Sequence, residues 1–265
     1  MLKDITLGQY FPIDSTIHKI DPRIKIISAI IYIIVVFMCK TPLSFLVAAT
    51  INLIIIYLSK INPTTVLKAL KPVWFLIVFT GIINLFLTSG NTYVLNWRFI
   101  KITHNGLQAA VYMSLRIILL VSYTSMLTFT TSPILLTDGI EALLRPFSKL
   151  GLPSHELAMM MTIALRFIPT LLEETDKIIM AQKSRGADFE SGNLFKRAKA
   201  LIPILVPLFI NSFRRADELA TAMECRCYRG GENRTRLKEL KLKRFDFICL
   251  FIVLISAITI YLCGV

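Results

Sequence analysis

The chain has 265 residues, of which 55% are hydrophobic and 18% are charged, and its formal net charge is +13. A soluble domain of this length is not normally so apolar, so the composition favours a polytopic membrane protein with its basic residues on one side of the bilayer. Nucleic-acid binding is disfavoured, because the basic residues are not interleaved with aromatic residues on a soluble platform.

Cysteines and histidines give no sign of a metal site or of a disulfide framework. The five cysteines are scattered, and the three histidines are too isolated to form a cluster with them. Cys225 and Cys227 have the spacing of half a metal site, but small residues at a helix end are the better interpretation. The first fifteen residues contain acids, Pro and Gly where a signal peptide requires a continuous apolar stretch, so no cleaved leader is expected.

Runs without charge predict about five membrane spans. The first, at 26–39, is shorter than the roughly 20 residues that a hydrocarbon core requires, so either the bilayer thins there or Lys25 and Lys40 snorkel. The remaining four runs are predicted to span with ordinary lengths. They lie at 41–59, 73–88, 107–130 and 247–265.

Three polar residues lie inside these spans. Arg116 is a candidate intramembrane functional charge, because a charge is costly there and is often functional. The favoured alternative is that it pairs with a buried polar group or caps a cluster of carbonyls on the cytoplasmic side. Asn52 and Asn84 are expected to form hydrogen bonds between helices. The "HNG" at 104–106 is expected to form an external turn.

The distribution of Lys and Arg predicts the orientation. The segment 132–245 alone contains 19 of the 30 basic residues. The positive-inside rule therefore places the N-terminus and this segment in the cytoplasm and the C-terminus outside. Three parts follow: a four-span membrane region at 1–131, a cytoplasmic domain at 132–245, and a last transmembrane helix at 246–265.

The cytoplasmic segment is expected to be helical, which makes the whole chain all-α. Polar stripes opposite apolar faces predict long amphipathic helices at about 154–185 and 196–226, and Pro146 is expected to kink or end an earlier helix. The uncharged stretch at 200–213 contains two prolines and only 14 residues, so a buried or interfacial helix is favoured over a span.

Both long helices finish with one pattern, seen in "DKIIMAQKSRG" at 176–186 and "DELATAMECRC" at 217–227. Ala and Arg lie four residues apart and share a helix face, so a partner can approach closely there. A cation at a helix C-terminus also offsets the macrodipole, but a matched pair favours two docking sites for a dimeric partner such as an ABC-type ATPase pair. The matching residues are Asp176, Ala181 and Arg185 in the first copy, and Asp217, Ala222 and Arg226 in the second.

With these features the chain resembles the transmembrane T component of energy-coupling factor (ECF) transporters, which import vitamins and metal ions in prokaryotes. The resemblance covers nearly the whole chain and includes "GQYFPIDSTIHKIDPRIK" at 8–25, "LRFIP" at 165–169 and both arginine-centred ends. The family carries two Ala-Arg-Gly-like triplets. In this chain the matching triplets are Ser184, Arg185 and Gly186, and Cys225, Arg226 and Cys227. Both arginines are kept, but both alanines and one glycine are replaced.

The resemblance implies a scaffold in the cell membrane rather than an enzyme. Its two arginine ends would enter grooves of two ATPase subunits, and its hydrophobic helices would hold a separate substrate-binding membrane subunit (S component). ATP hydrolysis would move the two helices relative to one another and release the cargo inside. The sequence has no GxxxxGK[ST] loop, so no cofactor is expected here and ATP would be bound by the partner subunits.

Three other classes of membrane protein fit the sequence less well. A membrane enzyme would need paired acids near a membrane face, whereas Glu173, Glu174 and Asp176 have the pattern of ordinary surface charge. A stand-alone carrier would show inverted repeats among its spans, whereas this chain repeats only in its cytoplasmic half. A conventional ABC permease, the nearest rival, usually docks its ATPase through one short coupling helix per subunit.

Overall fold

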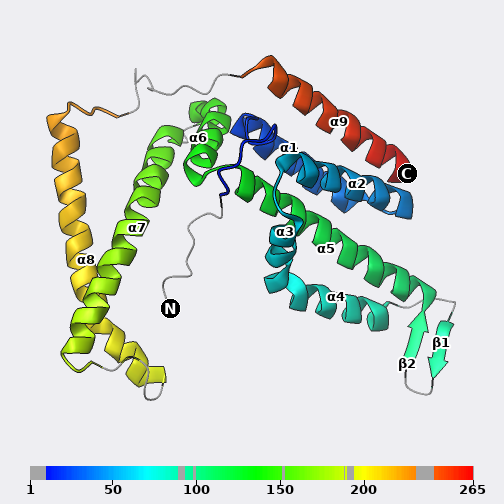
Figure 1. Cartoon of the computed structure of the whole chain (residues 1–265), viewed down its shortest axis with the longest axis horizontal. Coiled ribbons are helices and arrows are strands. Elements are labelled where there is room, and N and C mark those ends of the chain that lie inside the picture. Colours follow the sequence, from blue (N-terminus) through cyan, green and yellow to red (C-terminus); the bar gives the residue numbers. More distant parts are fainter. Residues whose placement is uncertain are drawn as a thin grey trace. The chain divides into compact units, whose positions relative to one another are not determined.

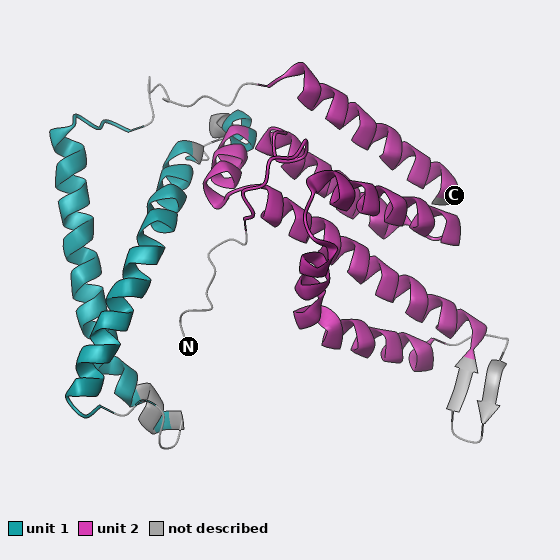
Figure 2. Cartoon of the chain, viewed as in Figure 1, with its two compact units in different colours: residues 1–7, 143–238 teal, residues 8–142, 239–265 magenta. Residues whose placement is uncertain are grey.

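The computed structural model describes residues 10–88, 93–97, 100–150, 153–187, 189, 194–230 and 242–264. The chain divides into two compact units (Figure 2). Unit 1 comprises residues 1–7 and 143–238, and unit 2 comprises residues 8–142 and 239–265. Each unit is a helical assembly, so the predicted all-α fold is confirmed with one small exception, a hairpin in unit 2.

Unit 2 contains most of the helices (Figure 1). Three of its helices, α1, α2 and α3, begin where a capping side chain precedes a proline at the first helical position, a combination that suits helix starts. The caps are Asp21, Thr41 and Asn62, and each accepts a hydrogen bond from a backbone N–H in the following turn. The helices are α1 (Pro22–Met38), α2 (Pro42–Ser59), α3 (Pro63–Leu70), α4 (Trp74–Leu87), α5 (His104–Thr130), α6 (Pro133–Leu144) and α9 (Arg244–Gly264), with a short 3-10 turn, η1 (Lys71–Val73), between α3 and α4.

The core of unit 2 forms around α5, which packs against α1, α2, α3 and α4, while α9 packs against α1 and α2. The rings of Tyr32 and Tyr123 stack at its centre with their centroids 4.1 Å apart. Val36 and Ala48 are fully buried beside them. Small and aromatic side chains therefore bring three of the predicted spans into close contact.

The hairpin and the start of α5 differ from the sequence-based expectation. Two antiparallel strands, β1 (Tyr93–Trp97) and β2 (Ile100–Thr103), precede α5. The predicted external turn at 104–106 was wrong, because α5 already begins at His104. Thr103 caps that helix by accepting a hydrogen bond from the N–H of Gly106 at 3.1 Å.

Five helical segments in the described residues are long and apolar enough to cross a membrane. Four of them cover the predicted spans after the first, although the segment Pro63–Leu87 begins well before the predicted span at 73–88. The predicted first span, α1, is not among the five and has 17 residues. The fifth is His155–Ser184, whose mean hydropathy of 1.2 is the lowest of the set. The predicted number of about five spanning helices is thus confirmed, but one of the five differs, because His155–Ser184 takes the place of α1.

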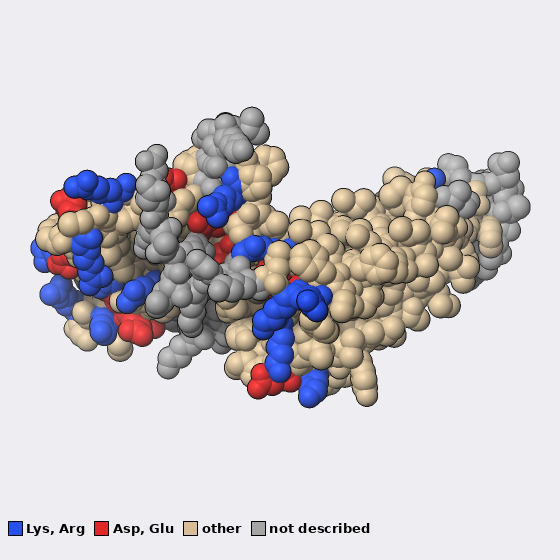
Figure 3. All heavy atoms as spheres, turned by 90° about the horizontal axis from the view of Figure 1, so that it is seen from above, with Lys and Arg blue, Asp and Glu red and all other residues tan. Residues whose placement is uncertain are grey.

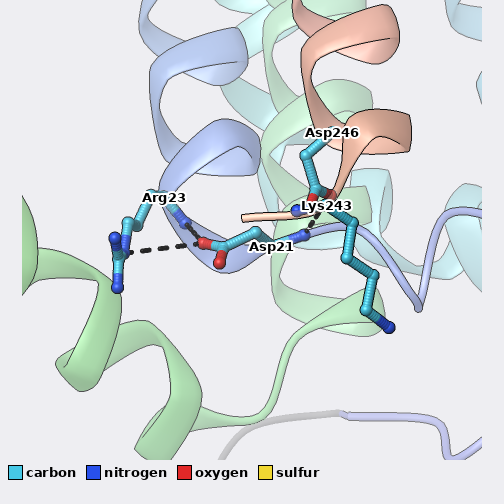
Figure 4. Close-up of polar contacts among 4 residues, drawn as sticks. All are labelled: Asp21, Arg23, Lys243 and Asp246. Carbon is cyan, nitrogen blue, oxygen red and sulfur yellow. Dashed lines mark hydrogen bonds and ion pairs between the residues drawn. The ribbon is translucent and has the colours of Figure 1, made fainter. Parts of the chain in front are cut away.

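A buried carboxylate joins the start of α9 to the start of α1 (Figure 4). The side chain of Asp246 is 2% exposed and accepts from the backbone N–H of Asp21 at 2.9 Å and from that of Lys243 at 2.8 Å. Asp21 in turn accepts from the backbone N–H of Arg23 and lies 3.8 Å from its guanidinium. The last predicted span is therefore fixed to the first at one end.

Unit 1 consists mainly of two long helices, α7 (Ser154–Ser184) and α8 (Leu194–Cys225), which confirm the predicted helices to within two residues at each end. They run antiparallel, since Phe167 of α7 contacts Arg215 of α8 and the later Glu174 contacts the earlier Asn211. Pro146 acts as expected, because α6 ends at Leu144 and continues as a 3-10 turn, η2 (Arg145–Leu150).

Candidate docking site

Arg185 occupies the C-cap position of α7 in a complete Schellman turn. The N–H of Gly186 donates to the carbonyl of Lys183 at 2.9 Å, and the N–H of Ala187 donates to the carbonyl of Gln182 at 3.0 Å. These two hydrogen bonds define the motif and satisfy carbonyls that the end of a helix otherwise leaves without partners. We call Ser184, Arg185 and Gly186 tip 1.

Arg226 occupies the same position at the end of α8. The N–H of Cys227 donates to the carbonyl of Glu224 at 2.8 Å, and the N–H of Tyr228 donates to the carbonyl of Met223 at 3.0 Å. We call Cys225, Arg226 and Cys227 tip 2. The sequence repeat is therefore also a structural repeat, in which each arginine closes a long helix by the same backbone turn.

The residue after each arginine has left-handed backbone geometry. Gly186 has φ of 85° and Cys227 has φ of 57°. Glycine adopts this conformation without strain, whereas any residue with a Cβ does so at a cost of about 1 kcal/mol or more. The departure from the family pattern at Cys227 thus places a strained residue directly beside the second arginine.

All six tip residues are exposed to solvent. Among the supporting residues, Ala181, Ala222 and Asp217 are exposed and Asp176 is half-buried. The structure does not bring the two tips together. They lie at opposite ends of the antiparallel pair, because each closes its own helix.

A cavity of about 470 Å³ lies beside tip 2. Figure 1 shows α7 and α8 separating toward the end at which α8 finishes, and the cavity is between them there. Apolar side chains from both helices line it, and Arg226 and Arg229 add cationic groups at its edge. The apolar residues are Met159, Ile163, Leu219 and Met223.

Glu174 is the residue that the sequence interpretation placed wrongly. It was expected to be ordinary surface charge, but its side chain is only 21% exposed and lies 3.6 Å from the guanidinium of Arg215 on α8. Its other oxygen accepts from the amide of Asn211 at 2.5 Å. Arg226 lies 41 residues after Arg185, and this offset aligns Glu174 with Arg215. A comparison of the charges at equivalent positions of the two copies could therefore have revealed the ion pair.

Arg116 has a partner that explains its place in a span. Its Nη2 donates at 2.9 Å to the carbonyl of Cys39, the C-cap residue of α1. The guanidinium also lies 5.7 Å and 5.8 Å from the ring centroids of Phe37 and Phe45. Arg116 therefore pairs with a backbone carbonyl, as its alternative role required, but this carbonyl lies at the end of α1 next to Lys40, on the side predicted to be external rather than cytoplasmic.

Asn52 makes the predicted contacts between helices. Its amide donates to the carbonyl of Leu119 at 3.2 Å, and its oxygen accepts from the hydroxyl of Ser122 at 3.0 Å, so α2 is bonded to α5. Asn84 differs, because its amide donates to the carbonyl of Thr80 in its own helix. Within the described ranges, no group of three or more His, Cys, Asp or Glu side chains is placed to hold a metal ion.

Comparison with known proteins gives a consistent result along the chain. Residues 14–237 match the family model CbiQ, described as "Cobalt transport protein". The chain is 58% identical to the "Energy-coupling factor transporter transmembrane protein EcfT" of Clostridium kluyveri, over 94% of this chain and 92% of the relative. Proteins of the same name from Acidaminococcus fermentans (56% identity, 93% and 91% covered) and Ruminiclostridium cellulolyticum (54%, 98% and 95%) match equally broadly.

Proposed function

The chain belongs to the family of energy-coupling factor transporter transmembrane proteins, and from this membership we propose that it links ATP hydrolysis in two cytoplasmic ATPase subunits to movement of a substrate-binding membrane subunit. The transported solute would be a vitamin or a metal ion bound by that separate subunit. ATP would be bound and hydrolysed by the partners, and this chain would transmit force.

The repeated tips carry the proposal. Two arginines end two long helices in the same Schellman turn, and both are exposed. A guanidinium at a helix end presents five donors in a planar fork, which suits insertion into a groove lined by carbonyl or carboxylate oxygens. Two equivalent tips on one chain match two equivalent grooves on a pair of similar subunits.

The surface of the long helices fits a membrane-embedded partner. Large apolar side chains remain exposed along the first half of α8 and as far along the helix as Phe213. An amphipathic helix with such a face needs a nonpolar surface to cover it. The substrate-binding subunit would be that surface. The exposed residues are Leu201, Ile202, Leu205, Val206, Phe209, Ile210 and Phe213.

The proposed topology follows from charge. Figure 3 shows a broad stretch of the surface that is almost free of Lys, Arg, Asp and Glu, whereas charged side chains gather elsewhere on the same face. We place unit 2 across a prokaryotic cell membrane, and the N-terminus and the segment 132–245 in the cytoplasm, with the C-terminus outside. Although α7 is long and apolar enough to cross a membrane, its ion pair with α8 favours a place outside the hydrocarbon core.

Site-specific photo-crosslinking tests the proposal. A photoreactive amino acid is placed at Ser184 or Cys225, one residue before each arginine, in cells that also produce the two ATPase subunits. Adducts to an ATPase subunit are expected from both positions. The matched control is the same amino acid at exposed Lys177 and Arg214 on the same helices. Equal adduct yields from the control positions, or none from the tips, would contradict docking at the tips.

A further inference from the structure

The crossing of α7 and α8 uses equivalent positions of the repeat. Glu174 lies eleven residues before Arg185, and Arg215 lies eleven residues before Arg226. These two side chains form an ion pair with 3.6 Å between Nη2 of Arg215 and Oε2 of Glu174. The contact between the helices is thus made at the same distance along the chain from each tip.

Neighbouring contacts hold the pair in place. The amide of Asn211 donates to the second oxygen of Glu174 at 2.5 Å, and the guanidinium of Arg215 lies 5.8 Å from the ring centroid of Phe167. The side chains of Glu174 and Arg215 are 21% and 33% exposed. Because both charges are partly buried, solvent screens their attraction less than it would on an open surface.

The charge pattern favours this crossing over alternative pairings. At the two equivalent places α7 carries Glu173 and Glu174, whereas α8 carries Arg214 and Arg215. Pairing either helix with a second copy of itself at this point would bring like charges together, which is unfavourable. The two copies of the repeat are therefore complementary at the point where they meet and alike at the tips.

We propose that Glu174 and Arg215 are positioning residues that set the spacing of the two docking arginines. This inference rests on the proposed function. At the rise of an α-helix, eleven residues place each arginine about 16 Å along its helix from the ion pair. Since the helices are antiparallel, the two tips lie on opposite sides of the crossing at equal distances. One ion pair thereby fixes the separation at which both ATPase subunits are engaged at once.

Spacing matters because docking at two sites is bivalent. When both tips are held at the correct separation, engagement of the first makes the second an intramolecular event, and this advantage is lost if the geometry forbids simultaneous contact. Disrupting the crossing should therefore weaken capture of an ATPase pair about 100-fold or more, although both arginines remain in place.

The test measures the distance between spin labels on the two tips of the full-length protein in lipid nanodiscs. Labels are attached at Cys225 and at a cysteine introduced by Ser184→Cys, which are equivalent positions of the repeat. Cys227, Cys249 and Cys263 are replaced by serine, and Cys39 is retained because it is only 2% exposed. The parent is expected to give one narrow distance distribution.

Charge reversal separates positioning from general destabilisation. Glu174→Arg and Arg215→Glu should each broaden the distribution, and the two together should restore the parent distribution. The matched controls, Glu173→Arg and Arg214→Glu, reverse the same charges one residue away on exposed positions and should leave it narrow. If a variant with a single charge reversal fails to fold, the milder Glu174→Gln and the variant with both charges exchanged test whether the ion pair sets the spacing.

Two results would overturn the proposal. An unchanged distribution in both single reversals would show that the pair does not set the spacing, and equal broadening by the controls would show that any charge change does. Capture of the ATPase pair is measured separately on unlabelled proteins that carry the same charge changes but retain Ser184, Cys225 and Cys227. If the distances broaden but capture is undiminished, the spacing of the tips is not linked to docking. If capture is lost only when Arg185 or Arg226 is changed, the proposed function remains intact.

Discussion

Asp246 and Asp21 lie 225 residues apart in the chain and are joined by a hydrogen bond of 2.9 Å, from the backbone N–H of Asp21 to Oδ1 of Asp246. The second oxygen of the same carboxylate accepts from the N–H of Lys243. This buried group therefore satisfies two donors at the starts of α1 and α9 (Figure 4). The C-terminal helix is consequently held to the first helix by a hydrogen bond from backbone to side chain as well as by apolar packing.

Removing this carboxylate should destabilise unit 2. Asp246→Ala leaves the buried N–H of Asp21 without its acceptor, at a cost of about 1–3 kcal/mol, and also removes the partly buried hydrogen bond from Lys243. The expected result is a lower midpoint of thermal unfolding in detergent. Lys243→Ala is the matched control, because only the backbone of Lys243 takes part. Equal midpoints for Asp246→Ala and the parent would show that the bonds do not contribute.

The strained turn at tip 2 predicts a stabilising substitution. Cys227→Gly should relieve the left-handed conformation and stabilise the end of α8 by about 1 kcal/mol. Gly186→Ala should do the reverse at tip 1, where no neighbouring atom lies within 4 Å and only backbone strain opposes the new Cβ. Hydrogen exchange of the terminal amides of each helix measures both changes. Faster exchange in Cys227→Gly than in the parent would contradict the assigned strain.

Arg116 should matter for folding more than for transport. Arg116→Met removes the hydrogen bond to Cys39 and the contacts with Phe37 and Phe45, so the unfolding midpoint should fall by an amount corresponding to about 2 kcal/mol. Uptake per folded complex should be unchanged. Loss of uptake without loss of stability would instead make Arg116 part of the transport pathway.

His18 should make stability depend on pH. Its Nε2 lies 3.0 Å from the carbonyl of Phe11 and therefore donates, so Nδ1 accepts from the hydroxyl of Ser15 at 2.7 Å. Burial lowers the pKa of His18 below its ordinary value of 6.5, and the nearby Lys25 acts in the same direction. The folded protein thus favours the neutral ring, and its stability should decline as the pH falls through 6.5.

Thermal unfolding between pH 7.5 and 5 measures this dependence. His18→Gln should flatten the profile, because the amide can donate to Phe11 without titrating. His104→Gln changes an exposed histidine and should leave the profile of the parent unaltered. A profile equally steep in His18→Gln would assign the pH dependence to another group.

Much of the fold could be predicted because its causes are local. Asp21, Thr41 and Asn62 each precede a proline that begins a helix, and Pro146 lies where α6 ends. The interior hydrogen bonds of Asn52 also followed from a polar side chain within an apolar span. Such features are decided by a few neighbouring residues and by the cost of an unpaired polar group.

The remaining features depend on contacts between distant residues. The residues around Glu174 do not by themselves indicate that it meets Arg215, and only a comparison of the two copies of the repeat points to the pair, because the crossing is set by the antiparallel packing of two helices. The hairpin of β1 and β2 follows the span predicted at 73–88 and forms by pairing between two short strands, which the charge pattern does not indicate. The left-handed geometry of Cys227 is imposed by the Schellman turn rather than by the preference of cysteine.

The central claim is that Arg185 and Arg226 are the points at which the ATPase subunits dock. The most direct measurement is co-purification of the ATPase pair with the parent, Arg185→Glu, Arg226→Glu and the double variant, with exposed Arg214→Glu as the control. Reversal of a docked charge should cost at least the ~2–5 kcal/mol expected for truncating one. Each single change should therefore weaken capture and the double should abolish it, while the control captures normally. Undiminished capture by the double variant would contradict the claim.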